Sequence, residues 1–251
     1  MAKKKKRASD QGASPATGFR PGSRVEGDLD LSHSDIEELP GHFVVGGSLD
    51  LSDTAITRLP RDLEVGGSLN LSQSDIERLP ENFHVPGNLV LLGTGISRLP
   101  RGLQVGGNLD LRASGIRELG KGLRVGGDLD LSGTMVERMP EGVRIGGNLF
   151  LVSSWLTRLP ADLNLEGGLD LSGTPITNLP KKMKLKSWLN LVGTGIAKLP
   201  QRLVVGGWLD LRATPVEKLP GKIRVGGNLY LSGSRVEDLP KGLDVAGRIE
   251  N

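Results

Sequence analysis

The chain has 251 residues, of which 37% are hydrophobic, 24% charged and only 3% aromatic, and its formal net charge is +3. This composition predicts a water-soluble protein and excludes a large aromatic core. Cysteine is absent, which excludes disulfides, thiolate metal sites and a cysteine nucleophile and is compatible with a reducing compartment.

The first 24 residues, MAKKKKRASDQGASPATGFRPGSR, are small, polar and basic, and we expect a disordered arm. No apolar run follows the basic start, so we expect no secretory signal peptide. No stretch in the chain approaches the roughly 18 apolar residues that a membrane span needs. The candidate targeting residues could form a nuclear-import signal, contact an anionic surface, or belong to a solvated tail, and they are Lys3, Lys4, Lys5, Lys6 and Arg7.

From Val25 onward the sequence repeats every 20 residues without insertion or deletion. Eleven full units end at Asp244 and a truncated twelfth ends at Asn251. Self-similarity of this kind predicts a solenoid over 25–251. Six places in the unit are apolar, and in the first unit they are Val25, Leu29, Leu31, Ile36, Leu39 and Phe43. One coil cannot bury its apolar side alone, whereas stacked coils share a continuous core.

Each unit predicts one strand of about five residues, such as 48–52, because Leu49 and Leu51 are two apart and point to the same side. The copies should pair as a parallel, in-register sheet with about 4.8 Å between coils, giving a rod roughly 50 Å long. Proline recurs after the fifth apolar place, as at Pro60, so the return side should be extended or 3₁₀-like. The predicted fold is a right-handed β-solenoid with one parallel sheet and almost no α-helix.

Two further columns of the repeat indicate structure. The glycine before the strand, as at Gly27 and Gly47, suggests a turn with positive φ or a close approach between coils. Every full unit also carries a hydroxyl at one place, which we expect to bond to the backbone at a turn and along its own column. The hydroxyl column is Ser34, Thr54, Ser74, Thr94, Ser114, Thr134, Ser154, Thr174, Thr194, Thr214 and Ser234.

The row GGSLDLSDTAITRLP, residues 46–60, resembles the leucine-rich repeat pattern L-x-x-L-x-L-x-x-N-x-L. Gly46 stands in place of the first leucine and Thr54 in place of the asparagine. The Leu59–Pro60 pair resembles the 20-residue "LPX" type found in bacterial secreted effector proteins. The resemblance covers 25–251 and implies a leucine-rich repeat solenoid. Some relatives carry a ubiquitin-ligase domain with a catalytic cysteine, and that activity is not implied for a chain without cysteine.

Catalysis is not expected from this array. The three histidines, His33, His42 and His84, fall in different columns, so their spacing gives no metal site. A Ser-His-Asp arrangement of Ser32 or Ser34 with His33 and Asp53 is conceivable, but Ser34 belongs to the hydroxyl column and no oxyanion device is evident. We therefore expect no enzyme, no cofactor, no metal and no small-molecule substrate.

The outward-facing place between the two strand leucines is mostly acidic. Neighbouring aspartates about 5 Å apart cost about 1 kcal/mol per pair even in water, which a basic partner or a cation could offset. The alternative is that exposed acids only keep the sheet soluble. The column is Asp30, Asp50, Asn70, Val90, Asp110, Asp130, Phe150, Asp170, Asn190, Asp210 and Tyr230, and its partner-binding candidates are Asp110, Asp130, Asp170 and Asp210.

Exposed apolar residues give the stronger indication of a binding surface. A contiguous apolar patch marks a partner site more often than an accident, and aromatics often carry most of the binding energy. The alternative is that these side chains merely cover the sheet. The apolar candidates are Phe150, Val152, Trp155, Trp188, Val192, Trp208 and Tyr230.

Taken together, the sequence predicts a non-catalytic scaffold that binds a macromolecule, most simply a protein, through its strand face. The alternative is a structural protein that self-associates end to end, because the C-terminal VAGRIEN stops within a coil. Nucleic-acid binding is the least supported, since the basic column at Arg58 and Arg78 alternates with glutamates and lacks stacking aromatics. We expect a cytoplasmic protein, and the resemblance implies translocation as an effector without a cleaved signal peptide.

Overall fold

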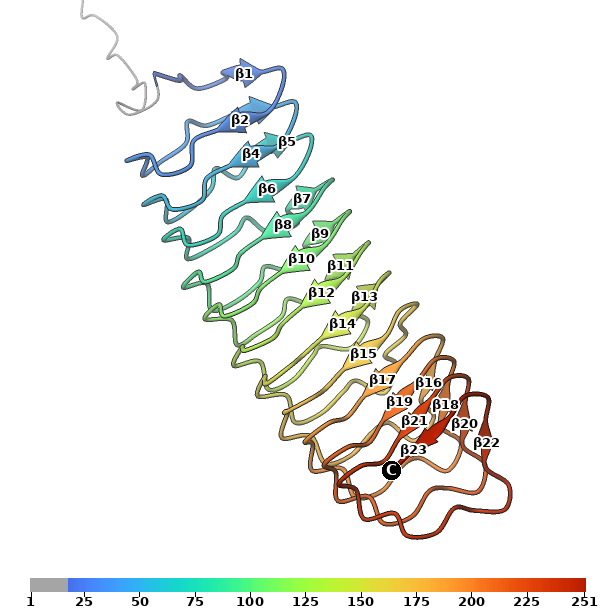
Figure 1. The fold of residues 1–251 in the computed structure, drawn as a ribbon. Coiled ribbons are helices and arrows are strands. Elements are labelled where there is room, and N and C mark those ends of the chain that lie inside the picture. The colour runs from blue at the N-terminus through green and yellow to red at the C-terminus, as the bar shows by residue number, and fades with distance from the viewer. Residues whose placement is uncertain (1–17) are drawn as a thin grey trace, which may run out of the picture.

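The computed structural model describes residues 18–251, which form 23 short strands and no helix (Figure 1). Twelve of the strands build one long sheet, here called the main sheet. In order along that sheet they are β2 (Leu29–Asp30), β4 (Leu49–Asp50), β6 (Leu69–Asn70), β8 (Leu89–Val90), β10 (Leu109–Asp110), β12 (Leu129–Asp130), β14 (Leu149–Phe150), β15 (Leu169–Asp170), β17 (Leu189–Asn190), β19 (Leu209–Asp210), β21 (Leu229–Tyr230) and β23 (Ile249–Glu250).

The main sheet is parallel and in register, so each leucine pairs with its copy one coil later, as Leu109 does with Leu129. Each strand proper is only two residues long, but the inter-coil hydrogen bonds extend further. The backbone N–H groups of Leu49, Leu51 and Asp53 donate to the carbonyls of Ser68, Asn70 and Ser72 at 2.9, 2.8 and 2.9 Å. The predicted parallel β-solenoid is therefore confirmed.

A second series of strands forms three shorter parallel sheets on another side of the coil, which the sequence analysis did not predict. These strands are β1 (Arg24–Val25), β3 (Val44–Val45) and β5 (Glu64–Val65); β7 (His84–Val85), β9 (Gln104–Val105), β11 (Arg124–Val125) and β13 (Arg144–Ile145); and β16 (Lys184–Leu185), β18 (Val204–Val205), β20 (Arg224–Val225) and β22 (Asp244–Val245).

One break between the shorter sheets has a direct chemical cause. In neighbouring coils the glycine after the strand donates to the previous coil, as Gly66 does to Val45 and Gly106 to Val85, both at 2.8 Å. The corresponding residue of the β7 coil is Pro86, which has no N–H to donate. The series is consequently interrupted between β5 and β7.

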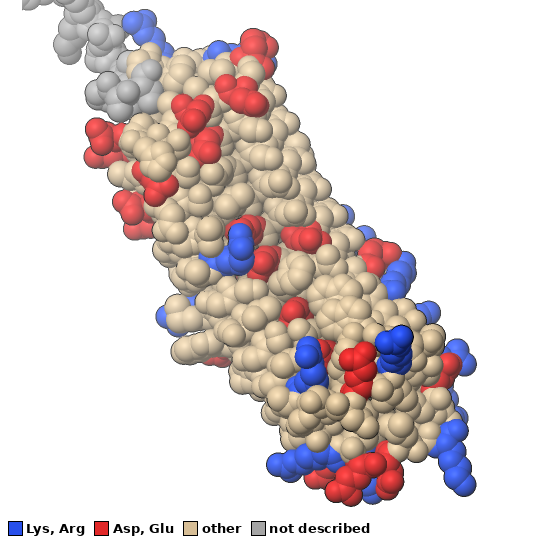
Figure 2. Space-filling model, viewed as in Figure 1, with Lys and Arg blue, Asp and Glu red and all other residues tan. Residues whose placement is uncertain are grey.

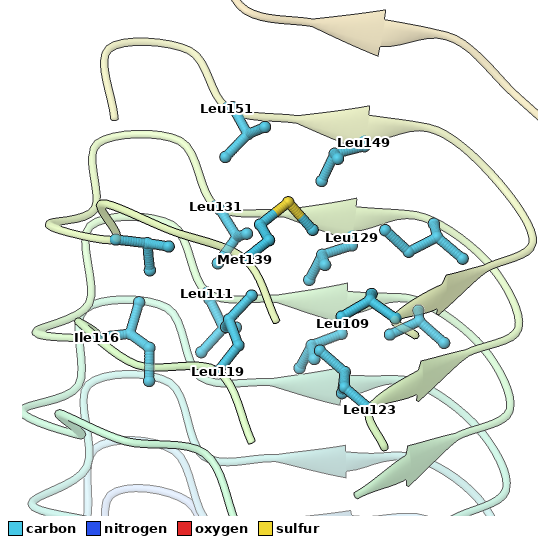
Figure 3. Packing of buried hydrophobic residues seen from close by; sticks show 14 of the residues in the cluster. Leu109, Leu111, Ile116, Leu119, Leu123, Leu129, Leu131, Met139, Leu149 and Leu151 are labelled. Atoms are coloured by element: carbon cyan, nitrogen blue, oxygen red, sulfur yellow. The ribbon is translucent and has the colours of Figure 1, made fainter. Parts of the chain in front are cut away.

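The core consists of the six predicted apolar columns. Leucines of successive coils stack upon one another, as Leu109, Leu129 and Leu149 do in Figure 3, and all three are fully buried. Burying a leucine is worth about 1.5–3 kcal/mol, so the stack is the main source of stability. The return side of each coil is extended and contains turns. Residues 18–251 contain no helix that is long and apolar enough to cross a membrane.

The glycine column before the strand marks a close approach between coils. A Cβ on Gly147 would lie 2.1 Å from Asp128 Oδ1 and 2.8 Å from the Gly127 carbonyl carbon. Positive φ occurs at the turn after the strand instead, as at His33 (54°), Asp53 (54°) and Ala113 (50°). Of the two reasons that the sequence offered for these glycines, close packing is the one that applies.

The coil structure begins before Val25. The Phe19 ring lies 5.0 Å from the Phe43 ring, and Arg24 already pairs with Val44 in β3. Residues 18–24 thus extend the first coil, although the sequence analysis assigned them to the arm. The rest of that predicted arm, with the targeting candidates Lys3 to Arg7, lies outside the described residues.

Candidate partner-binding face

A ladder of side-chain acceptors runs along the solenoid at the place just before the strand leucine. Each member accepts a hydrogen bond, 2.6–3.1 Å long, from the backbone N–H of the corresponding residue one coil later. We call this column the acceptor ladder, and its members are Asp28, Ser48, Ser68, Asn88, Asn108, Asp128 and Asn148. The ladder was not predicted, although short side chains with an oxygen acceptor recur at that place in the sequence.

The acceptor ladder stops at Gly168, Trp188 and Trp208, which have no oxygen in their side chains. It resumes at Asn228, whose Oδ1 accepts from the Arg248 N–H at 3.0 Å. The N–H groups of Trp188, Trp208 and Asn228 therefore receive no acceptor from this column. A typical intramolecular hydrogen bond contributes about 1 kcal/mol, so three consecutive coils forgo a stabilising contact.

Four aromatic side chains form a continuous row where the ladder is interrupted. The Phe150 and Trp188 rings lie 6.0 Å apart, the Trp188 and Trp208 rings stack at 5.0 Å with 5° between their planes, and the Tyr230 ring meets Trp208 edge-on at 6.4 Å. We call Phe150, Trp188, Trp208 and Tyr230 the aromatic row. The row crosses the coils of β14 to β21 on the outward side of the main sheet.

Gly168 makes this row possible. A Cβ at Gly168 would lie 2.1 Å from Cε2 of Trp188, so the indole occupies the space that a side chain would take. The indole therefore extends back over the β15 coil and reaches Phe150, which is two coils away from Trp188. The sequence signal was that, among the full units, the ladder column contains a glycine only here.

The C-terminal end of the row is held by polar contacts. Asn228 Nδ2 lies 3.1 Å from the Tyr230 hydroxyl, and the Arg212 guanidinium lies 5.5 Å from the Tyr230 ring centroid. Arg212 also donates two short hydrogen bonds, of 2.9 and 2.6 Å, to Oδ2 of Asp210, which is only 3% exposed. These hydrogen bonds with Asp210 raise the pKa of Arg212. Tyr230 is consequently fixed from two sides.

The remaining apolar candidates lie beside or apart from the row. Val152 and Val192 follow β14 and β17 two residues after Phe150 and Asn190, so they share the outward face of the sheet. Trp155 is 56% exposed and makes no ring contact with another aromatic in residues 18–251. The structure therefore assembles four of the seven candidates into one cluster and leaves Trp155 separate.

The aspartates of the outward column have hydrogen-bond donors within their own chain. Asp130 accepts from the Ser132 N–H at 2.9 Å, and Asp170 accepts from the Ser172 N–H at 2.9 Å and its hydroxyl at 2.6 Å. Ser32 donates to Asp30 in the same way and lowers the pKa of that carboxyl, its hydroxyl having the larger effect and its N–H the smaller. Donors within the chain thus offset part of the repulsion between neighbouring aspartates. A basic partner or a cation, as considered from the sequence, is not required for that part.

Arginine side chains neutralise part of this acidic column. Asp110 and Asp210 each pair with the arginine two residues later, at 2.6 Å, and Arg112 also lies 3.7 Å from Asp130. No Lys, Arg or His nitrogen in residues 18–251 lies within 4.0 Å of the Asp170 carboxylate. Among the four acidic candidates, Asp170 alone has a charge without an ion-pair partner in the described chain.

The hydroxyl column bonds within each coil. Thr54 Oγ1 donates to the Leu51 carbonyl at 2.7 Å, and most other members repeat this bond. The predicted bond to the backbone at the turn is confirmed. The predicted bonds along the column are wrong, because nine of the eleven hydroxyls donate to the carbonyl three residues before them. Ser154 Oγ is buried without a hydrogen-bond partner, and Ser234 Oγ accepts from the Val236 N–H at 3.4 Å.

The conceivable Ser-His-Asp arrangement is not assembled. Ser34 donates to the Leu31 carbonyl at 2.6 Å and Ser32 to Asp30 at 2.7 Å, so neither hydroxyl donates to His33. His33 Nδ1 lies 3.7 Å from Asp53 with both side chains largely in solvent. Across residues 18–251, no three His, Asp or Glu side chains are grouped as metal ligands.

Charge is distributed unevenly along the molecule. In Figure 2, acidic side chains dominate the N-terminal part of the visible face, whereas both charges occur toward the C-terminal end. Two members of the basic column form exposed ion pairs with glutamates of a neighbouring coil at 2.9 Å, Arg58 with Glu38 and Arg98 with Glu118. Other members, such as Arg78 and Arg138, have no acidic group within 4.0 Å in residues 18–251. Glutamates therefore oppose only part of the charge of this column.

Solved structures with a similar fold come from bacteria. They include a leucine-rich repeat protein of Leptospira interrogans, with 18% identity, a TM-score of 0.39 and coverage of 90% of this chain and 91% of that one. YopM, a leucine-rich effector protein from Yersinia pestis, has 16% identity, a TM-score of 0.38 and coverage of 88% and 82%. No protein-family model matches the sequence, and a search of curated proteins finds no significant match. The parallel β-solenoid is established by the strand pairings themselves, and these similarities assign neither a family nor a function.

Proposed function

We propose that the protein is a non-catalytic scaffold that binds a protein partner through the outward face of its main sheet, with the aromatic row at the centre. The observation that carries this proposal is the interruption of the acceptor ladder at Gly168, Trp188 and Trp208. There the indoles of the two tryptophans stack, and one of them covers the glycine. A chain that departs from its own stabilising rule at one place commonly does so for function.

The composition of the row suits this role. Tryptophan and tyrosine are enriched among the residues that carry binding energy at protein interfaces, where they are surrounded by polar groups. Val152 and Val192 widen the apolar surface, and Asp110, Asp130, Asp170 and Asp210 belong to the polar surround in this proposal. Trp155, which is more exposed than the row, would mark an extension of the interface.

A capture experiment with matched variants tests the proposal. The intact protein is compared with a Phe150→Ser, Trp188→Ser, Trp208→Ser variant, and with a control that carries Asp50→Ser, Asn70→Ser and Val90→Ser at outward positions of earlier coils. Circular dichroism and thermal melts first establish that all three fold alike. We expect a partner to be retained by the control and lost by the aromatic variant. Equal retention by the control and the aromatic variant would refute the proposal.

A second function, self-association, is favoured by the last coil. Leu239 is 46% exposed there, against 6% for Leu219 in the coil before, and it lines a hollow of about 620 Å³ together with Leu219, Val236 and Arg235. Light scattering over a range of concentrations separates the two functions, because assembly predicts a mass that grows with concentration and display predicts a constant monomer mass. A role as a translocated effector stays a prediction that the family resemblance alone implies.

A further inference from the structure

We propose that the partner presents an amphipathic α-helix, which lies lengthwise along the aromatic row and places a lysine or arginine against Asp170. This inference rests on the proposed function and names the chemistry of the partner. It follows from the shape of the row, from the contacts that its rings already make, and from the charge beside it.

Strand addition does not fit this face. A peptide that adds a strand needs an unpaired sheet edge. The main sheet continues without interruption from β14 through β15, β17 and β19 to β21, each strand paired with both neighbours. The backbone N–H and C=O groups beneath the row are therefore already paired with neighbouring strands, and a partner must bind through side chains.

Flat ring ligands do not fit the centre of the row, because both faces of the Trp188 indole are occupied. One side of the Trp188 indole covers Gly168 and the other stacks on Trp208. Trp208 in turn meets Tyr230, and Arg212 lies over the Tyr230 ring. A sugar or a nucleobase that stacks on an aromatic platform would find no free face on Trp188.

The dimensions of the row match a short helix. From Phe150 to Tyr230 the row spans four coil steps, which is about 19 Å at about 4.8 Å per step. A helix of about 13 residues has the same length, and its turns repeat every 5.4 Å, close to the coil spacing. Apolar side chains on successive turns of a helix can thus contact successive rings, with Val152 and Val192 at the side.

The charge beside the row adds a polar requirement. Asp170 lies in register between Phe150 and Asn190, and its donors Ser172 and Asn190 are neutral. Nearby acids are already paired, Glu166 with Lys186 and Asp210 with Arg212. The uncompensated carboxylate next to the rings is complementary to one cationic side chain among the apolar ones of the helix.

Two model peptides provide the probe. One has about 18 residues, or five turns, of leucine and lysine with leucines at helical spacing, and the other has the same composition with leucine and lysine in strict alternation. Calorimetry and tryptophan fluorescence measure their binding to the intact protein. We expect the helical peptide to bind at least about tenfold more tightly than the alternating one and to gain helical circular dichroism.

Gly168→Asn is the decisive variant. Asparagine occupies this place in the preceding coil as Asn148, and the three atoms nearest to a Cβ at 168 all belong to the indole of Trp188, so the fold should tolerate it. The displaced indole should weaken helical-peptide binding about tenfold. Asp170→Asn should weaken binding about threefold, whereas Asp50→Asn in an earlier coil should leave it unchanged. Trp188→Ala serves the same purpose if Gly168→Asn does not fold.

Equal binding of the two peptides, or equal binding of the helical peptide by the intact protein and the Gly168→Asn variant, would overturn the helix inference. Partner capture that depends on the aromatic row would leave the proposed function intact in that case. Loss of that dependence in the capture experiment would instead remove the proposed function, so the two failures are distinguishable.

Discussion

The coils that carry the acceptor ladder and the coils that carry the aromatic row share one interior. The strand leucines are fully buried in both regions, as at Leu109 and Leu189, and pair in the same register. The two regions differ at two outward places. In the ladder column Asn108 accepts a hydrogen bond from the next coil and Trp208 cannot, and between the strand leucines Phe150 and Tyr230 stand where other coils have aspartate. The comparison places stability in the inward columns and the proposed recognition surface in one stretch of two outward columns.

The largest expected effect tests whether the interior is indeed equivalent. Leu109→Ala and Leu189→Ala should each lower the free energy of unfolding by about 2–5 kcal/mol, because both create a cavity in a fully buried stack. Chemical denaturation of the two variants should give values within about 1 kcal/mol of each other. A much smaller cost for Leu189→Ala would show that the coils beneath the aromatic row are packed more loosely.

A medium effect tests the ladder. Asn108→Ala removes the oxygen that accepts from the Asp128 N–H at 2.8 Å, so the free energy of unfolding should fall by about 0.5–1.5 kcal/mol. Asn108→Ser keeps an acceptor, as at Ser68, and should cost less. Thermal and denaturant melts measure both, and partner capture should be unaffected. The ladder would have no stabilising role if the alanine and serine variants melted together with the intact protein.

The smallest effect concerns the carboxylates of the N-terminal coils. The hydroxyl and N–H of Ser32 lower the pKa of Asp30 from its ordinary value of 3.8. The unfolded chain then binds more protons than the folded chain, so this contribution to stability is present above pH 3.8 and is lost as the pH falls through the lower folded pKa. Ser32→Ala should raise the pKa of Asp30, which an NMR titration of the side chain detects. An unchanged titration would mean that the Ser32 hydroxyl does not affect the pKa of this carboxylate.

Much of the fold could be predicted because the period never breaks. The leucine columns fixed the stacking, and the position of Pro60 argued against a helix on the return side. The shorter sheets were missed, since each of their strands contributes one inward apolar residue, as Val65 beside the exposed Glu64, whereas two leucines two positions apart mark each strand of the main sheet. The hydrogen bond of the Thr54 hydroxyl to the backbone at the turn was predicted correctly. The additional bond to the hydroxyl of the next coil was not formed, because sequence does not show which acceptor lies nearest.

The candidate site could be predicted in composition but not in geometry. Phe150 and Trp188 are 38 positions apart and in different columns, so only the missing side chain at Gly168 explains why their rings meet. The internal partners of Asp170 and Asp210 depend on side-chain rotamers, which the repeat pattern does not specify. The role of Trp155 and of the acidic candidates in binding stays a prediction.

Hydroxyl-radical footprinting of the purified complex, read by mass spectrometry, tests the central claim most directly. Both regions contain suitable reporters, His33 and His84 in the ladder coils and the four side chains of the aromatic row in the other. The account predicts protection of Phe150, Trp188, Trp208 and Tyr230 on binding, with His33 and His84 unchanged. Protection confined to the ladder coils, with the aromatic row as reactive as in the free protein, would contradict it.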